Sequence, residues 1–209
     1  TNTDDILALV WAFIDAVIPG QSFSLAGESY GGYLSEGIVY QYPERVDGLL
    51  LICPLSQADR ALADNPPKTV LVQEEEFLAS LPKDQREGFG SVSVVQTREN
   101  WERTEREVKV GLNVCNYSFT KRISSVGSYA FSSPITPLTE PFEKPTLMLL
   151  GRQDHIVGYK DTWQIYDDYP HASFVVLDRA GHNLQIEQAG LFNALVHEWL
   201  GRVEEATRP

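Results

Sequence analysis

Three residues that lie far apart in this chain have the types needed to activate a hydroxyl group for attack on a carbonyl carbon. They are Ser29, Asp154 and His182. A serine hydroxyl is a poor nucleophile at neutral pH, so it needs an imidazole that accepts its proton and a carboxylate that orients and stabilises that imidazole. We therefore predict that Ser29 is the nucleophile, His182 the general base and Asp154 the acid of a catalytic triad.

The surroundings of Ser29 give this prediction its structural basis. Ser29 is the centre of Gly27-Glu28-Ser29-Tyr30-Gly31, between an apolar run at residues 22–26 and a helical pattern. Gly-x-Ser-x-Gly alone is common and usually marks a turn. A strand that turns directly into a helix brings backbone against backbone, so a small residue is needed on each side of the serine. The context predicts a nucleophile elbow, with the hydroxyl close to the unpaired N–H groups of a helix start.

Asp154 and His182 each follow a predicted strand. Residues 146–150 (TLMLL) come shortly before Asp154, and residues 173–177 (SFVVL) come shortly before His182. Open α/β sheets bind ligands at the carboxyl ends of their strands, so we expect both side chains at the same edge as Ser29. The chain order of serine, acid and histidine is the order found in the α/β-hydrolase fold.

Strands and helices alternate in the first and last parts of the chain, which predicts an α/β fold with a parallel sheet flanked by helices. Residues 46–53 form a strand that is apolar on both faces, as in buried parallel sheets. Further helices are predicted at residues 31–42, 159–166 and 187–203. The first helix is expected to start at a Thr3 cap and to stop at Pro19-Gly20. Its apolar stripe consists of Ile6, Val10, Phe13 and Val17, supported by Leu7, Ile14 and Ile18.

The middle of the chain has a different character, with proline-rich breaks between charged and mostly helical segments such as residues 98–110. We therefore predict an α/β core made of residues 1–54 and 145–209, interrupted by an insertion at residues 55–144. The aromatic side chains of the insertion are expected to form its own core, with one or two facing a pocket. They include Trp101, Tyr117, Phe119, Tyr129 and Phe131.

These motifs resemble the α/β-hydrolase superfamily, and within it the lid-bearing branch of proline iminopeptidases, small-ester hydrolases and carbon–carbon bond hydrolases. The resemblance extends over almost the whole chain. It rests on the elbow with Gly32 behind it, residues 42–46 (YPERV), residues 151–154 and Gly181-His182. It implies that the insertion is a helical lid over the active site. It also implies a serine hydrolase that cleaves an acyl bond of a small molecule through an acyl-enzyme, without a metal or an organic cofactor.

The chain departs from this family at its start. The family's sheet has several strands before the helix that leads into the elbow strand, whereas this sequence begins at that helix, so we expect an N-terminally incomplete fold. A loop absent here carries one oxyanion-hole donor in the family, which leaves the backbone N–H of Tyr30. Loss of one such donor typically costs about 100-fold to 1000-fold in turnover. The elbow strand is then a sheet edge, open to a second copy of the chain or to an N-terminal segment.

Composition and charge limit the possible partners. The chain has 209 residues, of which 43% are hydrophobic and 22% charged, and a net charge of −12. This charge repels a phosphate backbone and no basic run counters it, so nucleic acid is not an expected partner. No apolar run reaches about 18 residues and the start of the chain is unlike a signal peptide, so we expect no membrane partner and a cytoplasmic location. Cys53 and Cys115 form no metal-ligand spacing and are expected to be reduced.

Several other ionisable residues are alternatives to these roles. Glu28 is interpreted as structural or pocket-lining, because neighbours at a tight elbow point away from each other. Asp59 is a weaker alternative acid, and Asp154 could instead cap a helix. Glu74 to Glu76 fit a solvated helix face, or lid carboxylates that hold a substrate amine as in aminopeptidase-like relatives. No chemistry is assigned to His155, His171 or His197.

Two functions from other classes remain open. An acyltransferase could use the same triad with a thiol or an alcohol in place of water. A non-catalytic binding protein could keep the pocket after losing the chemistry, since half of the oxyanion hole is absent from this sequence.

Overall fold

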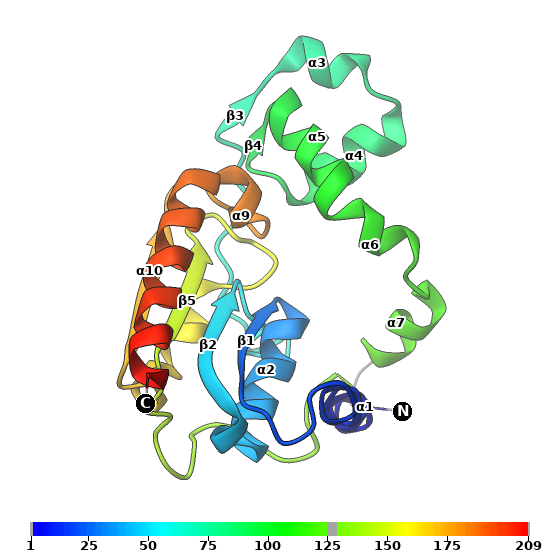
Figure 1. The fold of residues 1–209 in the computed structure, drawn as a ribbon. Coiled ribbons are helices and arrows are strands. Elements are labelled where there is room, and N and C mark those ends of the chain that lie inside the picture. Colours follow the sequence, from blue (N-terminus) through cyan, green and yellow to red (C-terminus); the bar gives the residue numbers. More distant parts are fainter. Residues whose placement is uncertain (1, 125–128, 209) are drawn as a thin grey trace.

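The computed structural model describes residues 2–124 and 129–208. Their central feature is a four-stranded parallel sheet with the order β1-β2-β5-β6 (Figure 1). The strands are β1 (Phe23–Glu28), β2 (Val46–Ile52), β5 (Thr146–Gly151) and β6 (Ala172–Leu177). The predicted α/β fold with a parallel sheet is therefore confirmed. At every end the strand bounds lie within two residues of those predicted.

The two inner strands are buried on both faces, as their continuous apolar sequences predict. Side chains from alternate positions enter two separate cores. On one face Leu50, Leu147 and Leu149 pack with Trp199 and Val203 of α10 (Ala189–Thr207). On the other face the leucines at alternate positions of β2 pack with α1 (Thr3–Val17) and α2 (Tyr30–Gln41). Because fully burying one leucine side chain contributes about 1.5–3 kcal/mol, these two faces supply much of the stability of the fold.

The first helix differs from its prediction in two ways. Asn2, not Thr3, is the N-cap. Its side-chain oxygen accepts the Asp5 backbone N–H at 3.0 Å, and the Asp5 carboxylate accepts the Asn2 backbone N–H at 3.2 Å. The buried face carries Leu7, Val10 and Ile14. Phe13 and Val17, predicted as part of that face, are 68% and 59% exposed. The predicted stripe is wrong at these two residues because α1 has apolar side chains on more than one face. Which face is buried is decided by packing against the sheet, and the helical period alone does not contain it.

The elbow helix α2 lies against the sheet and buries an acidic side chain. Glu36 is 2% exposed, and burial raises its pKa to about 8, so it is protonated at neutral pH. The hydroxyl of Ser56 lies 3.5 Å from its carboxyl group. After α2, Tyr42 ends the helix and the short helix η1 (Pro43–Arg45) leads into β2.

The remaining core helices are shorter or shifted relative to the prediction. The helix predicted at residues 159–166 is α8 (Tyr159–Trp163) followed by the single turn η2 (Tyr166–Asp168). The closing helix α10 follows a separate turn of helix, α9 (Leu184–Glu187). Trp199 anchors α10 on the sheet, because its indole N–H donates to the Pro145 carbonyl at 3.0 Å.

The segment between β2 and β5 contains five helices and two short strands within the described residues. They are β3 (Val72–Gln73), α3 (Glu75–Ser80), α4 (Lys83–Val92), β4 (Val95–Gln96), α5 (Arg98–Glu107), α6 (Lys109–Asn113) and α7 (Tyr117–Ile123). The helix predicted over residues 98–110 therefore breaks after Glu107. Part of the predicted insertion, residues 125–128, lies outside the described residues.

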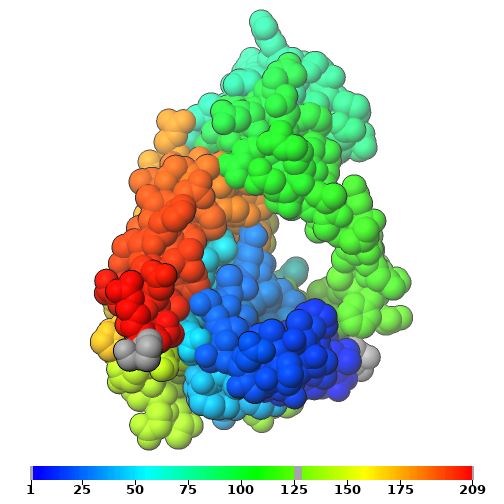
Figure 2. Space-filling model, viewed as in Figure 1, coloured from blue at the N-terminus to red at the C-terminus, as the bar shows by residue number. Residues whose placement is uncertain are grey.

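The insertion leaves the core at one end of the sheet and returns beside α1 (Figure 1). The space-filling view shows a hollow between α6 and α7 on one side and the N-terminal part of the chain on the other (Figure 2). Within the insertion, α3 and α4 form their own apolar cluster of Phe77, Leu78 and Phe89. Glu187 joins this part to the core by accepting the backbone N–H groups of Val94 at 2.7 Å and Val95 at 3.1 Å.

None of the helices within the described ranges has both the length and the apolar character needed to cross a membrane.

Candidate active site

The backbone at Ser29 has the strained geometry of a sharp turn between strand and helix. Its φ of 55° and ψ of −122° place it in a region that non-glycine residues rarely adopt. Such a conformation costs about 1–3 kcal/mol and persists only where surrounding contacts hold it. Here the Ser29 N–H donates to the carbonyls of Ile52 at 3.0 Å and Cys53 at 3.1 Å, and its own carbonyl accepts the Leu55 N–H at 2.9 Å. The end of β2 therefore holds Ser29 in place.

Gly27 and Gly31 are the two positions near Ser29 where the sequence predicts that only a glycine fits. The structure requires a glycine at the first of them but not at the second. A Cβ on Gly27 would clash with the Gly31 carbonyl and the Ser35 hydroxyl, which explains the glycine before the serine. A Cβ on Gly31 would meet nothing within 4 Å, so the predicted crowding at this position is wrong. The close approach occurs one residue later, where a Cβ on Gly32 would lie 2.7 Å from the Cβ of Pro54.

Asp154 and His182 are joined directly. The His182 Nδ1 lies 2.8 Å from Asp154 Oδ2, in a pair whose aspartate side chain is 1% exposed and whose histidine side chain is 14% exposed. The other oxygen, Oδ1, accepts the backbone N–H groups of Ile156 at 2.8 Å and Val157 at 3.1 Å. Asp154 thus organises its own turn and also binds the imidazole. With Nδ1 donating to Asp154, the Nε2 of a neutral His182 is free to accept a proton.

The electrostatics of the pair favour a basic imidazole. Burial lowers the pKa of His182, but the hydrogen bond and charge of Asp154 outweigh it, with smaller contributions from Glu28 and Glu187, so that the pKa is raised above its ordinary value. Glu28, the last residue of β1, is itself half-buried, and burial raises its pKa. The side-chain amide of Gln185 donates to both Glu28 oxygens at 3.1 Å. This agrees with the interpretation of Glu28 as a structural residue near the site.

The loop that carries His182 is fixed against the end of β5. A Cβ on Gly151 would clash with the Gly181 carbonyl and would lie 2.6 Å from that of Ala180, so the two backbones touch at this point. The Gly181 N–H donates to the Glu187 carboxylate at 2.5 Å. Burial raises the pKa of Glu187, and its three backbone donors oppose that rise. Glu187 therefore connects the histidine loop to the insertion.

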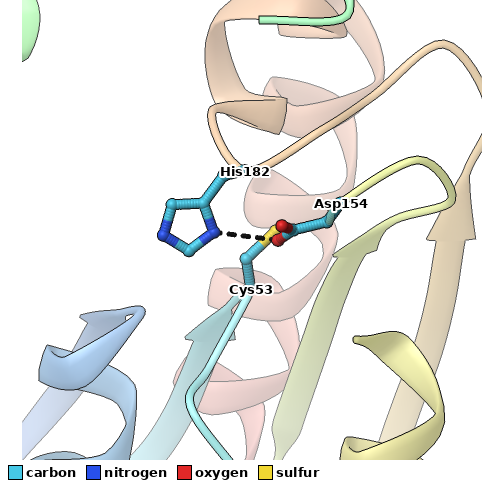
Figure 3. A group of neighbouring side chains, drawn as sticks. All are labelled: Cys53, Asp154 and His182. Carbon is cyan, nitrogen blue, oxygen red and sulfur yellow. Dashed lines mark hydrogen bonds and ion pairs between the residues drawn. The ribbon is translucent and has the colours of Figure 1, made fainter. Parts of the chain in front are cut away.

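Cys53 is part of this constellation, although sequence patterns gave it no role. Its thiol comes from the end of β2 and lies beside Asp154 and His182, with ligand atoms of the three within 4.8 Å of one another (Figure 3). These three could together hold a metal ion, but His182 and Asp154 already bind each other. Burial, followed by the charge of Asp154, raises the pKa of the Cys53 thiol well above its usual range, so it stays protonated and is no nucleophile. The signal that could have identified it is its position directly after a strand.

Ser29 opens into a cavity of about 340 Å³. The walls are formed by the segment after β2, by Tyr129 and by the loop after β5, with the lining residues Pro54, Leu55, Ser56, Gln57, Arg60, Ala63, Asn65, Tyr129, His155, Ile156, Val157, Gly158 and Asp161. Among the described residues no hydrogen bond joins the Ser29 hydroxyl to the His182 imidazole. Such bonds are often long before substrate binds. The structure therefore brings Asp154 and His182 together directly. It places Ser29 after β1, which β2 separates from β5 in the sheet.

Comparison with known families agrees with this arrangement. Residues 1–189 match the family model described as the alpha/beta hydrolase fold. The chain belongs to the alpha/beta hydrolase fold family. Members of this family are generally hydrolytic enzymes. The resemblance to the α/β-hydrolase superfamily, stated from the sequence motifs, is thereby confirmed.

Solved structures of α/β hydrolases match the chain over nearly its whole length. An alpha/beta superfamily hydrolase from Oenococcus oeni PSU-1 is 24% identical with a TM-score of 0.88, over 97% of this chain and 75% of that chain. A thermophilic esterase is 19% identical with a TM-score of 0.61, over 97% and 74%. A serine hydrolase from Cycloclasticus zankles is 18% identical with a TM-score of 0.59, over 95% and 70%. No curated protein sequence matches this chain.

In this α/β hydrolase, Tyr30 begins the elbow helix. As the first residue of α2 it has no acceptor inside the helix for its backbone N–H. Its hydroxyl lies 2.9 Å from Thr3 Oγ1, and its ring stacks on Tyr129 with centroids 5.0 Å apart. The start of α1 and the insertion therefore meet at the elbow.

Of the aromatic residues predicted in the insertion and the alternative acid, only some lie near Ser29. Tyr129 lines the Ser29 cavity, Phe131 packs on Tyr33 and Trp101 packs on Phe77. Tyr117 is 64% exposed, so its predicted place in a core is wrong. The alternative acid Asp59 accepts the Ala61 N–H at 2.9 Å within its own turn.

The remaining histidines and the acidic run are separate from Ser29, with one exception. His171 lies 3.2 Å from Glu143 at the surface, and His197 Nδ1 contacts the Asn193 carbonyl within α10. Residues 74–76 line a different hollow, together with Arg98. His155, to which no role was assigned, is the exception because it lines the Ser29 cavity.

Proposed function

We propose that this α/β hydrolase cleaves an ester, amide or related acyl bond of a small molecule through an acyl-enzyme on Ser29. The observation that carries the proposal is the 2.8 Å contact between His182 and the buried Asp154, at the same sheet edge as a serine in strained elbow geometry. A buried carboxylate bound to Nδ1 leaves Nε2 as the proton acceptor, which is the arrangement that general-base activation of a serine requires.

The proposed reaction has two stages. His182 Nε2 takes the proton of the Ser29 hydroxyl as the oxygen attacks the carbonyl carbon, while Asp154 stabilises the imidazolium. The backbone N–H of Tyr30 donates to the oxyanion of the tetrahedral intermediate. His182 then gives its proton to the leaving group, and the acyl group stays on Ser29. In the second stage His182 takes a proton from water as the water oxygen attacks the acyl carbon. It then gives that proton to the Ser29 oxygen as the bond to the acyl carbon breaks, which releases the acid and free Ser29.

The insertion at residues 55–144 is proposed to act as a lid over this site. Its first part and Tyr129 supply much of the cavity lining around Ser29. Glu187 accepts N–H groups from both the histidine loop and the insertion, so movement of the insertion is coupled to the loop that carries His182.

Exchanging Ser29 for alanine tests the proposal. Ser29→Ala is expected to lower turnover of p-nitrophenyl acetate by at least about 1000-fold, because the nucleophile is lost. Ser22→Ala, at an exposed serine just before β1, is the matched control and should leave turnover unchanged. Unchanged turnover in Ser29→Ala would refute the mechanism.

Two alternative functions are separated by further measurements. An acyltransferase on the same triad would give the acylated acceptor as the main product when a thiol or an alcohol is added. A non-catalytic binding protein is favoured by one observation, the lack of a hydrogen bond between Ser29 and His182 among the described residues. Such a protein would bind ligands in the cavity without turning over any ester.

A further inference from the structure

The Ser29 cavity contains an arginine without an acidic partner, although the chain carries a net charge of −12. Arg60 lines the cavity and makes no hydrogen bond or ion pair with any residue in the described ranges. Its charge acts on the hydroxyl of Tyr129 across the cavity, where it lowers the pKa against the larger effect of burial. An unpaired guanidinium beside a nucleophile offers a binding site for an anion.

The segment that carries Arg60 is anchored on both sides. Before it, the Ser56 hydroxyl lies 3.0 Å from that of Thr162. After it, the Asn65 side chain donates to the Ile156 carbonyl at 3.0 Å. Within the turn, Asp59 accepts the Ala61 N–H at 2.9 Å. These bonds fix the backbone on either side of Arg60, and the residue itself is exposed where it lines the cavity.

The nearby acids are already engaged elsewhere. Asp64 forms an ion pair with Lys160 at 2.7 Å. Asp161, the acid in the cavity lining, is 9% exposed and accepts the Asp64 N–H on both oxygens, at 3.3 and 3.2 Å. Within the described residues, neither of these acids forms an ion pair with Arg60.

The rest of the lining favours a short carbon chain. Leu55, Ile156 and Val157 supply apolar surface between the polar groups of the cavity. A ligand that places a carbonyl at Ser29 and a carboxylate at Arg60 would bury its methylene groups against these side chains. Each buried methylene contributes about 0.8 kcal/mol.

We propose that the natural substrates carry a carboxylate on the acyl side, as in monoesters of short dicarboxylic acids, and that Arg60 binds this carboxylate. The inference rests on the proposed function, because it assigns the substrate class of the same site. Arginine is suited to this role because its planar guanidinium binds a carboxylate through two parallel hydrogen bonds.

Two matched esters test the proposal. p-Nitrophenyl hydrogen adipate carries the carboxylate, and methyl p-nitrophenyl adipate has the same acyl chain without the charge. The wild-type chain is expected to have the higher kcat/KM for the anionic ester. Arg60→Gln should lower that value by about 10-fold to 100-fold and leave the neutral ester within about 2-fold, since a charge-assisted pair is lost. Arg60→Lys should recover part of the loss.

The control is Lys68→Gln, which removes the same charge from an exposed position of the same segment outside the cavity. It should change neither ester. Equal kcat/KM for the two esters in the wild-type chain, or equal losses for both in Arg60→Gln, would overturn the assignment of Arg60 while leaving the hydrolase proposal intact.

Binding gives a second readout that does not need turnover. In a Ser29→Ala background, which lacks the proposed nucleophile, monomethyl adipate should bind the chain that keeps Arg60 about 10-fold or more tightly than the chain with Arg60→Gln by calorimetry, with Lys68→Gln unchanged. If neither ester is hydrolysed, the hydrolase proposal fails and this binding ratio alone decides the role of Arg60. A ratio of one would refute it.

Discussion

At the scale of single residues, the site depends on how one carboxylate is shared. Asp154 uses one oxygen for the N–H groups of its own turn and the other for His182. The two interpretations of such an aspartate, turn cap and triad acid, are therefore compatible. Sequence alone cannot separate them, because both place an aspartate directly after a strand.

The charge on Glu28 should be visible in the pH dependence of activity. His182 must be neutral to accept a proton, and its pKa is raised above the ordinary 6.5. Activity is therefore present above this raised pKa and lost as the pH falls through it. Because the charge of Glu28 contributes to the rise, Glu28→Gln should move the acid limb of kcat/KM to lower pH and leave the plateau within about 3-fold.

Glu204→Gln is the control for this profile, since Glu204 is exposed on α10. Its acid limb should coincide with that of the wild-type chain. An acid limb that moves to higher pH in Glu28→Gln would contradict the assigned electrostatics.

At the scale of elements, two adjacent glycines at the start of α2 differ in whether a side chain would fit. Gly32→Ala would place a Cβ 2.7 Å from Pro54 Cβ, so it should destabilise the fold by about 1–3 kcal/mol. Gly31→Ala meets open space at an early helical position and should be neutral or stabilising by up to about 1 kcal/mol. Urea unfolding of the two variants measures the difference. Equal losses would show that the elbow backbone differs from the one described.

The core elements were predictable because their signals are local. Continuous apolar runs identified β2 and β5, and the glycine-flanked serine identified the turn into α2. The contact face of α1 was predicted incorrectly, since Phe13 and Val17 are as apolar as the residues that pack. The break after Glu107 was also missed. Both depend on contacts with distant segments, which periodicity does not contain.

The site itself was only partly predictable. Asp154 and His182 were identified from strand ends, and their direct contact follows from the parallel sheet. Cys53 and His155 were not assigned to the site, because no motif marks a residue that reaches it only through packing. Arg60 could not be singled out either, since an arginine in a polar turn has no distinguishing pattern until the cavity wall is known.

At the scale of the whole molecule, the outer edge of β1 is unpaired within the described sheet, where β1 pairs only with β2. Ser24 and Ala26 are exposed on this strand, and Leu9, Phe13 and Val17 form an exposed apolar face of α1. An open edge beside apolar surface favours pairing with another strand. We propose that a second copy of the chain binds here.

Sedimentation analysis of the 209-residue chain is expected to show dimers at micromolar concentration. Ala26→Lys should weaken the dimer, because charged side chains on an edge strand oppose pairing. Ala206→Lys, an exposed change on α10, should not. A monomer in the wild-type chain would refute pairing between copies.

The central claim is that Ser29 is a nucleophile activated by His182 and Asp154. The most direct measurement is mass spectrometry of the chain after reaction with a fluorophosphonate, which labels only activated serines. One adduct is predicted, on the peptide that contains Ser29, with labelling strongly reduced in His182→Ala. An unlabelled chain, or an adduct on another serine, would contradict the account.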